Sequence, residues 1–380
     1  MIEHAWKDHA ARLAETAAHR GSRWYAPIAT TPRHRFVPGW WQADGDAWNV
    51  RDGTADEAEW LRIAYSDRTL VTRVGTTHAD QAPEASRVTG RPTSSSTLPG
   101  LVVGMLRHAR IAEDSHVLDV GTGSGYSAGV LSAFLGDERV TSIDIDSYLT
   151  KVAAERLAEI DRHPTIATLD ATGPLPGTYD RIVSMVSVRP IPPAWLAALK
   201  PAGRLVTTVT NTTLIITADK TEDGGAVGWV ERDRAGFMAT RSGGDYPPPP
   251  AEVHVAVKDL DGDAVTTGRY PVLDVIEAWD LQSMLELTAP DIQHHFEQRP
   301  DGQRTAWMLH ADGSWARATG RRGDPPTVHQ AGPRRLWDIL EKIRHRLNMS
   351  GDLPVRGAKV RIDPDGVIHL RRGAWTATVR

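Results

Sequence analysis

The stretch that decides the fold is VLDVGTGSGYSAGVL, residues 117–131. Its apolar run, residues 117–120, predicts a buried strand, and glycines at 121, 123 and 125 predict a tight turn into a helix. Such a turn presents backbone N–H groups at the helix N-terminus to a bound ligand. Glycine suits these positions because a β-carbon would block the close approach of the backbone. The stretch therefore predicts a ligand-binding unit of strand, turn and helix.

Outward from this stretch, apolar runs alternate with helical patterns between about residues 98 and 217. This alternation predicts βαβ units and a mostly parallel sheet, so the expected fold class is α/β and Rossmann-like. The predicted strands are 116–120, 139–145, 165–170, 179–186 and 203–209, and the predicted helices between them are 126–136 and 148–160.

The pattern changes on both sides of this region. Residues 1–90 contain one predicted helix, at 3–20, and otherwise irregular sequence. After GGDYPPPP (243–250), which predicts a stiff extended spacer, Asp-Gly turns predict hairpins in MLHADGSWARA (308–318) and VRIDPDGVIHL (360–370). We therefore predict three parts: an N-terminal substrate-side segment (1–90), the domain with the glycine turn (91–245) and a C-terminal α+β extension rich in hairpins (251–380).

Composition limits the possible functions. The 380 residues are enough for two domains, and the net charge of −4 gives no reason to expect a nucleic-acid or anionic-membrane partner. The chain has no cysteine, so disulfides, thiolate metal sites and a cysteine nucleophile are excluded. The charged N-terminus does not resemble a signal peptide, and no run is long and apolar enough for a membrane span. We expect a cytoplasmic protein.

Two aspartates follow the predicted strands beyond the glycine turn. Asp144 ends the next strand, about twenty residues on, where a carboxylate can accept hydrogen bonds from both hydroxyls of a ribose. Asp170 ends the third strand, where an acidic side chain can reach an adenine amino group. Each taken alone is also compatible with a solvated loop. The order of glycine turn, Asp144 and Asp170 favours an adenosine-binding site.

The glycine turn resembles the first motif of class I S-adenosylmethionine-dependent methyltransferases. Further segments resemble the protein-L-isoaspartate O-methyltransferase family, in family order, over roughly residues 25–217. They are TPRHRFVP (31–38), AYSDRTLVTRVG (64–75), PTSSSTLPGLVVGML (92–106), VLDVGTGSGY (117–126) and YDRIVSMVSVRPIPPAWLAALKPAGRLV (179–206). The resemblance implies S-adenosyl-L-methionine as cofactor and S-adenosyl-L-homocysteine as product. The cofactor-binding residues that it implies, together with the two aspartates, are Asp119, Gly121, Thr122, Gly123, Gly125, Tyr126, Asp144, Ile145, Asp170 and Ala171.

The resemblance also implies a reaction, the esterification of a peptide carboxylate. In this family the ester then loses methanol as a backbone amide nitrogen attacks it, which gives a succinimide (aspartimide). The serine- and threonine-rich stretch and the long C-terminal extension are more similar to family members that modify ribosomally synthesised peptides. In particular, they are similar to members paired with ATP-grasp ligases in graspetide maturation. The implied partner is then a precursor peptide that such a ligase has macrocyclised.

The stretch PTSSSTLPG, residues 92–100, holds the implied catalytic hydroxyl. Family enzymes carry Ser-x-Pro here, with the serine facing the carboxylate, whereas this chain has Thr97-Leu98-Pro99. A threonine hydroxyl can still donate one hydrogen bond, although its methyl group restricts the rotamer. We expect Thr97 to be catalytic, with Ser96 as the alternative, and Thr97 is also a candidate helix N-cap. The residues expected to bind substrate are Ser95, Ser96, Thr97, Val186 and Ser187.

No metal site is expected, because no group of ligand residues has convincing spacing. DLDGD (259–263) favours a hairpin turn over a calcium loop, and QHHFEQ (293–298) favours a solvated helix over a metal site. A further helix is predicted after Pro333, with Arg335, Lys342 and Arg346 along one edge. That edge suits an acidic peptide, or it is an ordinary solvated face.

Three functions remain open. The favoured one is a peptide-tailoring carboxyl methyltransferase that esterifies an aspartate and so promotes aspartimide formation. The second is general repair of isoaspartyl residues in damaged proteins, with the same cofactor and chemistry. The third is a protein that binds S-adenosylmethionine or a peptide without turnover, which only the replacement of serine by Thr97 suggests.

Overall fold

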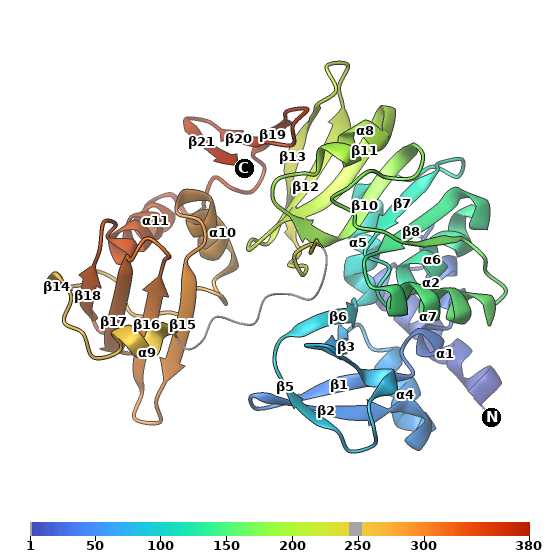
Figure 1. Ribbon diagram of the computed structural model, residues 1–380, viewed down its shortest axis with the longest axis horizontal. Helices are drawn as coiled ribbons and strands as arrows, with labels where there is room; N and C mark the ends of the chain where they lie inside the picture. The colour runs from blue at the N-terminus through green and yellow to red at the C-terminus, as the bar shows by residue number, and fades with distance from the viewer. Residues whose placement is uncertain (1, 243–252) are drawn as a thin grey trace.

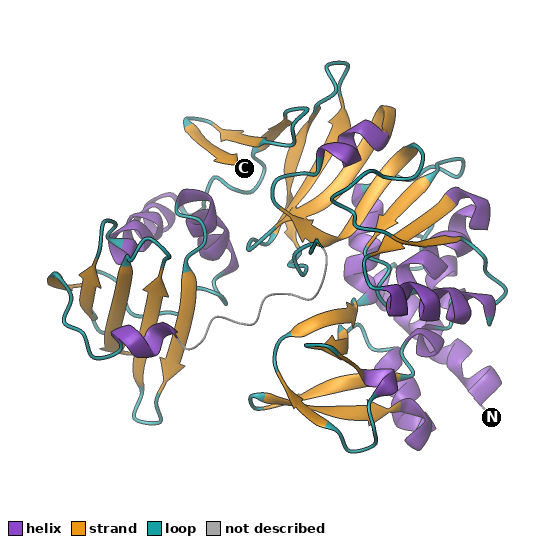
Figure 2. Cartoon of the chain, in the orientation of Figure 1, coloured by secondary structure: helices purple, strands orange, loops and turns teal. Residues whose placement is uncertain are grey.

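The computed structural model describes residues 2–242 and 253–380. Their strands form sheets of six, ten and five strands, which Figure 1 shows as an N-terminal, a central and a C-terminal sheet. Figure 2 shows that most helices gather beside the central sheet and along one side of the C-terminal sheet. The predicted spacer at 243–250 lies outside the described residues.

The parallel half of the central sheet confirms the predicted strands. Its strands are β7 (Val117–Val120), β8 (Val140–Asp144), β9 (Thr165–Thr168), β10 (Tyr179–Val188) and β11 (Leu199–Val209), in the spatial order β9-β8-β7-β10-β11. The helices that accompany them are α5 (Pro99–His108), α6 (Tyr126–Leu135), α7 (Ser147–Ala158), α8 (Pro193–Ala198) and the short 3₁₀ helix η3 (Asp137–Arg139). Every residue of β7 is buried, which explains its unbroken apolar run.

Antiparallel strands extend the central sheet beyond β11. In order, they are β12 (Leu214–Lys220), β13 (Ala226–Arg234), β19 (Lys359–Ile362), β20 (Ile368–Arg372) and β21 (Trp375–Val379). The predicted hairpin in 360–370 therefore exists, but it pairs with β13 and completes the central sheet. The boundary predicted at residue 251 consequently does not separate the sheets, because the end of the chain returns to the central one.

The N-terminal sheet is the largest element that the sequence did not predict. Its strands are β1 (Gly39–Asp44), β2 (Ala47–Asp52), β3 (Leu70–Val74), β4 (Thr77–His78), β5 (Arg87–Thr89) and β6 (Pro92–Ser96). The helices of this part are α1 (Ile2–Ala17), which confirms the predicted helix, α2 (Tyr25–Thr30), α3 (Arg33–Phe36), α4 (Glu57–Ala64), η1 (Gly53–Ala55) and η2 (Ala79–Gln81). Because β6 pairs with β3, this sheet runs past the boundary predicted at residue 90.

The C-terminal sheet confirms one predicted hairpin and corrects two other predictions. Its strands are β14 (Ala264–Thr267), β15 (Gln293–Gln298), β16 (Gln303–Leu309), β17 (Trp315–Arg321) and β18 (Thr327–Ala331), and its helices are α9 (Val253–Val257), α10 (Trp279–Thr288) and α11 (Leu336–Ser350). β16 and β17 form the hairpin predicted in 308–318, and α11 is the helix predicted after Pro333. The predicted helix at 293–298 is wrong, because these residues are β15, and DLDGD joins α9 to β14, so it is not a hairpin turn.

One hydrophobic cluster joins the central sheet to the C-terminal part. It contains Leu214 of β12 together with Leu285 of α10 and Leu340 of α11. Arg356 adds hydrogen bonds from its guanidinium to the carbonyl oxygens of Thr213 and Asp233. The C-terminal helices therefore pack on the antiparallel side of the central sheet. Among the described residues, no helix has both the length and the apolar character needed to cross a bilayer.

Candidate functional site

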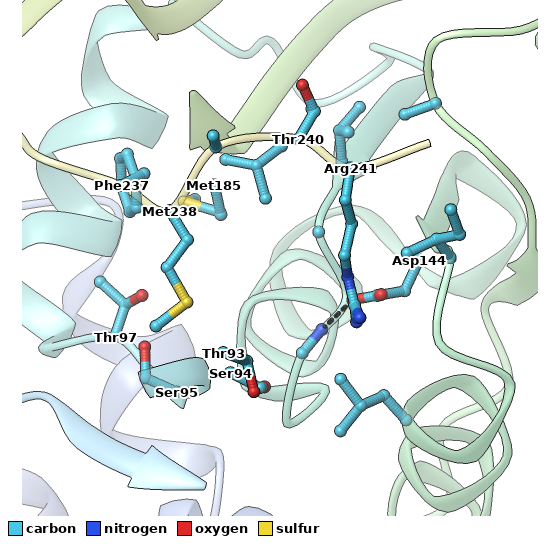
Figure 3. Close-up of a pocket in the computed structure, with 18 of the residues that line it drawn as sticks. Thr93, Ser94, Ser95, Thr97, Asp144, Met185, Phe237, Met238, Thr240 and Arg241 are labelled. Carbon is cyan, nitrogen blue, oxygen red and sulfur yellow. Dashed lines mark hydrogen bonds between the residues drawn. The ribbon is translucent and has the colours of Figure 1, made fainter. Parts of the chain in front are cut away.

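A cavity of about 250 Å³ lies where the parallel strands end. Along the sheet, the chain proceeds in one direction from β7 through β8 to β9 and in the other from β10 to β11. Ligands of open α/β sheets bind beside such a reversal, at the carboxyl ends of the strands. The last residues of β7 and β8 and the middle of β10 line this cavity, and Figure 3 shows side chains from these strands around it.

The glycine turn forms one wall of the cavity. Gly121 and Gly123 line it with φ of +95° and +51°, a left-handed backbone conformation that favours glycine. A β-carbon on Gly121 would lie 3.0 Å from the side chain of Val186, and a β-carbon on Gly123 would lie 3.3 Å from the carbonyl oxygen of Ser95. Gly125 does not line the cavity, and a β-carbon there would lie 2.9 Å from Ala153. The structure thus brings two of the three predicted glycines to the cavity and uses the third for packing against α7.

Asp144 points from the end of β8 toward the glycine turn. Its carboxylate accepts hydrogen bonds from the backbone N–H groups of Gly123, at 2.9 Å, and Asp146, at 3.1 Å. Burial raises the pKa of Asp144, and these backbone N–H groups partly offset that effect. Ile145 and Ala171, both predicted to bind cofactor, also line the cavity. The cavity therefore combines a fixed carboxylate with apolar wall residues.

The predicted cofactor residues Asp119, Thr122 and Tyr126 lie behind the glycine turn and do not line this cavity. Asp119 accepts hydrogen bonds of 2.8 Å from the hydroxyls of Ser127 and Ser142, and Thr122 contacts Ser142 at 2.7 Å. These contacts tie the turn to α6 and β8. Asp119 and Thr122 thus support the backbone that lines the cavity.

Asp170 also lies outside the cavity lining. Its Oδ1 atom accepts hydrogen bonds from the backbone N–H and the hydroxyl of Thr172, at 2.8 and 2.7 Å. The carboxylate of Asp170 is therefore engaged by Thr172, two residues further along the chain. Binding of adenine by Asp170 stays a prediction, which this arrangement does not favour.

Buried Asp119 makes stability depend on pH. Burial raises its pKa from 3.8 to about 6, so the folded state binds this proton more tightly than the unfolded state does. Stability from this group is therefore present below about pH 4 and lost as pH rises through 6. Relative to Asp119→Asn, we expect the wild type to lose about 2–3 kcal/mol of unfolding free energy between pH 4 and 7. Urea unfolding of both proteins measures this, and a constant difference would contradict the assignment.

The hydroxyl stretch of β6 forms the opposite wall. Ser95 and Thr97 line the cavity, and Figure 3 shows their hydroxyls on the cavity side, near Met238. Ser96 is only 1% exposed and faces a separate gap of about 20 Å³ behind the turn. Within the described part of the chain, its hydroxyl has no hydrogen-bond partner. The structure thus places Thr97, and not Ser96, in the lining of the larger cavity.

The alternative role of Thr97 as an N-cap is wrong. Leu98 occupies the N-cap position of α5, without a side-chain cap. The carboxylate of Asp67 accepts a hydrogen bond of 2.7 Å from the backbone N–H of Gly100 in the first turn. Because a residue from a distant loop supplies this contact, the threonine hydroxyl is not used for capping.

A buried arginine fixes the hydroxyl stretch. The guanidinium of Arg33, in the segment TPRHRFVP, donates hydrogen bonds to five backbone carbonyl oxygens, which belong to Ala64, Ser66, Arg68, Ser96 and Thr97. Burial lowers the pKa of Arg33 to about 10, so the side chain stays charged at neutral pH. Arg33 therefore holds together the loop after α4 and the end of β6. The sequence of this segment does not reveal that role, because the carbonyl groups that Arg33 contacts are distant in the chain.

The segment 236–241 covers the cavity, and the sequence analysis missed it entirely. Phe237, Met238, Thr240 and Arg241 line the cavity from this segment. Two backbone hydrogen bonds of 2.8 Å anchor it to Ser187, which donates to Met238 and accepts from Thr240. Val186 lines the cavity as predicted, whereas Ser187 is 1% exposed and acts through its backbone.

A charged cluster ties this segment to the rest of the site. Asp146, which caps α7 through the backbone N–H of Tyr148, lies 3.5 Å from Arg241, 3.5 Å from His78 and 3.7 Å from Arg73. Burial alone would raise the pKa of Asp146, but the hydrogen bond and charge of His78 and the charge of Arg73 hold it well below its usual range. The covering segment, the N-terminal sheet and α7 therefore meet at one carboxylate.

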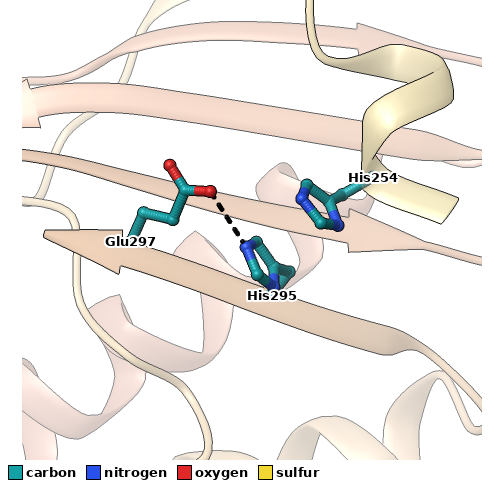
Figure 4. Close-up of side chains that lie close together, drawn as sticks. All are labelled: His254, His295 and Glu297. Atoms are coloured by element: carbon teal, nitrogen blue, oxygen red, sulfur yellow. Dashed lines mark hydrogen bonds and ion pairs between the residues drawn. The ribbon is translucent and has the colours of Figure 1, made fainter. Parts of the chain in front are cut away.

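A cluster of possible metal-ligand residues lies where α9 faces β15 of the C-terminal sheet. His254, His295 and Glu297 place their ligand atoms within 4.8 Å of one another, and His295 contacts Glu297 at 3.2 Å (Figure 4). The two imidazole rings are stacked 3.6 Å apart at an interplanar angle of 11°. Nitrogen lone pairs lie in the ring plane, so in stacked rings they run side by side and do not converge on one ion. The geometry shown is that of a stacked pair, and the absence of a metal stays a prediction.

Strand order, the glycine turn after β7 and the carboxylate after β8 together define a class I S-adenosylmethionine-dependent methyltransferase fold. The chain matches the family model "Protein-L-isoaspartate(D-aspartate) O-methyltransferase (PCMT)" over residues 74–234. This protein belongs to the protein-L-isoaspartate O-methyltransferase family.

Individual relatives support this assignment. The chain is 34% identical to a protein-L-isoaspartate O-methyltransferase of Opitutus terrae over 184 residues, which are 48% of this chain and 62% of that protein. It is 30% identical to the protein-L-isoaspartate O-methyltransferase of Gloeobacter violaceus, over 48% of this chain and 72% of that protein. The match to the Opitutus protein thus covers less than two thirds of that relative's length.

A solved structure extends the likeness in fold. A chain titled protein-L-isoaspartate O-methyltransferase aligns with a TM-score of 0.51 and 14% identity, covering 98% of this chain and 100% of that one. At this identity the likeness concerns the fold alone. The alignment covers nearly the whole chain, so the likeness in fold includes the C-terminal part.

Proposed function

We propose that this protein transfers the methyl group of S-adenosylmethionine to a carboxylate of a polypeptide and so forms a methyl ester. The observation that carries the proposal is that one cavity is lined both by residues expected to bind the cofactor and by the hydroxyl expected to face the acceptor. Gly121, Gly123 and Asp144 lie on one wall and the hydroxyl of Thr97 on another. The names of the relatives support a carboxyl acceptor.

The residues present fit this cofactor. Gly121 and Gly123 leave space that a β-carbon would fill, Asp144 would accept hydrogen bonds from the ribose hydroxyls, and Ile145 and Ala171 would border the adenine. When bound, S-adenosylmethionine supplies an electrophilic methyl group.

The protein's task is then to position a carboxylate and exclude water. A carboxylate is already ionised at neutral pH, so no general base is required. The hydroxyls of Thr97 and Ser95 can each donate a hydrogen bond to an acceptor oxygen. Phe237 and Met238 cover the cavity with apolar side chains, which keeps water from the reacting atoms. Rate should therefore come mainly from orientation.

Replacing Thr97 by valine tests the hydroxyl wall. The change keeps the side-chain shape but removes one donor, so we expect turnover to fall about 10-fold or more with cofactor affinity unchanged. Ser96→Ala is the matched control, because Ser96 does not line the larger cavity. Steady-state methyl transfer and calorimetric titration with S-adenosylhomocysteine measure the two effects. Full activity in Thr97→Val with loss in Ser96→Ala would reverse the assignment.

Two acceptors fit this chemistry. The first is the isoaspartyl carboxylate of a damaged protein, which the family membership supports. The second is an ordinary aspartate in a ribosomally made peptide that an ATP-grasp ligase has macrocyclised, with aspartimide as the later product. Threonine in place of the family's serine favours the second, because its methyl group changes the room beside the acceptor.

The C-terminal extension is proposed to recognise that peptide. Lys342 and Arg346 on α11 are exposed, as an acidic partner would require, while Arg335 lies 3.8 Å from Asp263. Since β19, β20 and β21 complete the central sheet, the part that can act as a docking module lies before residue 351.

Methyl transfer to three substrates separates the two acceptors. They are a macrocyclised precursor peptide, its linear form and an unrelated isoaspartyl hexapeptide. A preference for the macrocycle supports peptide tailoring, because a preorganised acceptor loses less conformational freedom on binding. A preference for the hexapeptide would contradict tailoring and leave isoaspartyl repair.

A further inference from the structure

A second and larger cavity, of about 1030 Å³, lies in the N-terminal part of the molecule. Strands β1, β2 and β3, helix α4 and residues 82–85 line it, and we call it the N-terminal groove. Its volume is at the upper end of the ~300–1000 Å³ typical of small-molecule sites, so it can hold more than one side chain. None of the cofactor-binding residues lines it.

The groove adjoins the cavity of about 250 Å³ that Thr97 and Asp144 line. Thr69 lines both cavities, and its hydroxyl accepts a hydrogen bond of 3.2 Å from the backbone N–H of Leu98, the neighbour of Thr97. Thr69 is therefore the point at which a polypeptide whose carboxylate lies at Thr97 would enter the groove. The guanidinium of Arg33 donates hydrogen bonds to the carbonyl oxygens of Arg68, beside the groove, and Thr97, beside the smaller cavity. These bonds hold the two cavity walls together where they meet.

The groove offers fixed aromatic surface. Trp48 is half-buried and donates its indole N–H to the carbonyl oxygen of Gly90 at 3.0 Å, whereas Trp41 is only 2% exposed and packs beneath the groove. Since the indole N–H of Trp48 is satisfied within the protein, its ring keeps one orientation. Rigid aromatic rings of this kind contribute contact area at low entropic cost in peptide recognition.

One cation at the junction is different from the other two cations that line the groove. Arg62 forms two hydrogen bonds of 2.6 Å with Glu59, and Arg51 donates to Gln42 at 2.7 Å. Arg68 is exposed beside Thr69, and within residues 2–242 and 253–380 its guanidinium has no hydrogen bond or ion pair. An exposed guanidinium next to the acceptor site is suited to pair with a carboxylate.

We propose that the N-terminal groove binds the polypeptide strand that flanks the methyl-accepting residue, and that Arg68 pairs with an acidic side chain of that strand. The inference rests on the proposed function, because the acceptor position at Thr97 fixes where the strand enters. It assigns to the substrate an acidic residue close to the methylated one.

Peptide selection tests the proposal without requiring turnover. Two pools of ten-residue peptides, one with a central aspartyl and one with a central isoaspartyl residue, carry flanks randomised over Ala, Leu, Glu and Lys. Immobilised protein saturated with S-adenosylhomocysteine captures peptides, which mass spectrometry then identifies. At one flanking position, we expect the wild type to enrich Glu over Lys about fivefold or more. Arg68→Glu should invert that preference while S-adenosylhomocysteine still binds.

Arg12→Glu is the matched control, because Arg12 is an exposed arginine on α1 and is not part of the groove lining. It should keep the wild-type preference. No charge preference in the wild type, or the same preference in Arg68→Glu, would overturn the groove assignment. Captured peptides that accept no methyl group from S-adenosylmethionine would support the groove and contradict the proposed function.

Discussion

Replacing Asp144 by alanine is expected to weaken S-adenosylmethionine binding by about 1.5–3 kcal/mol, or roughly 10- to 150-fold. The carboxylate lines the cavity and is held by two backbone N–H groups, so it needs no rearrangement to accept hydrogen bonds from ribose hydroxyls. Its loss also releases the Gly123 N–H that shapes the turn. Calorimetric titration of the folded variant measures the effect.

Asp170→Ala is the matched control for Asp144→Ala. Both aspartates follow parallel strands, but Asp170 bonds to Thr172 and does not line the cavity. We expect its removal to change cofactor affinity by less than about 0.5 kcal/mol. Equal losses in the two variants would contradict the placement of the cofactor, and unchanged affinity in Asp144→Ala would contradict the role of that carboxylate.

Replacing Arg33 by methionine is expected to lower the free energy of unfolding by about 3–5 kcal/mol, which is typical for a buried, hydrogen-bonded charge network. Methionine fills part of the space but leaves five backbone carbonyl oxygens without this donor. Because two of them belong to Ser96 and Thr97, methyl transfer should also fall at temperatures where the variant remains folded.

Arg35→Met is the control for Arg33→Met. Arg35 is on the same short helix, but its side chain is 46% exposed and lies 3.6 Å from Glu159. Exposed pairs of this kind contribute about 0–1 kcal/mol, so we expect a small change. Urea unfolding of both variants compares the two costs. A similar cost for both would show that the buried carbonyl network does not stabilise the fold.

The parallel half of the central sheet was predictable because apolar runs in the sequence alternate there with helical patterns. The N-terminal sheet was not, because pairing across distant segments stabilises strands that carry little signal of their own. β6, PTSSS, contains no large apolar residue, yet it pairs with β3 from Leu70 to Val74. Likewise, QHHFEQ forms a strand because β16 supplies its hydrogen-bond partners.

The residues of the candidate site also fall into two groups, those that local motifs predicted and those that only tertiary contacts bring to the cavity. Residues within local motifs, such as Gly121, Asp144 and Thr97, were predicted and do line the cavity. Segment 236–241 was missed because only its pairing with Ser187 brings it over the cavity, and no local pattern encodes that contact. The cap that Asp67 supplies to α5 is likewise a tertiary contact, which a local reading assigned to Thr97.

The most direct test of the central claim is methyl transfer from S-adenosyl-[methyl-³H]methionine to two acceptors, an isoaspartyl hexapeptide and a macrocyclised aspartyl peptide. We predict tritium in a base-labile ester of at least one acceptor, with S-adenosylhomocysteine formed in equal amount, and a much lower rate in Thr97→Val. Tight binding of S-adenosylmethionine with no S-adenosylhomocysteine from either acceptor would contradict the claim and leave a binding protein without turnover.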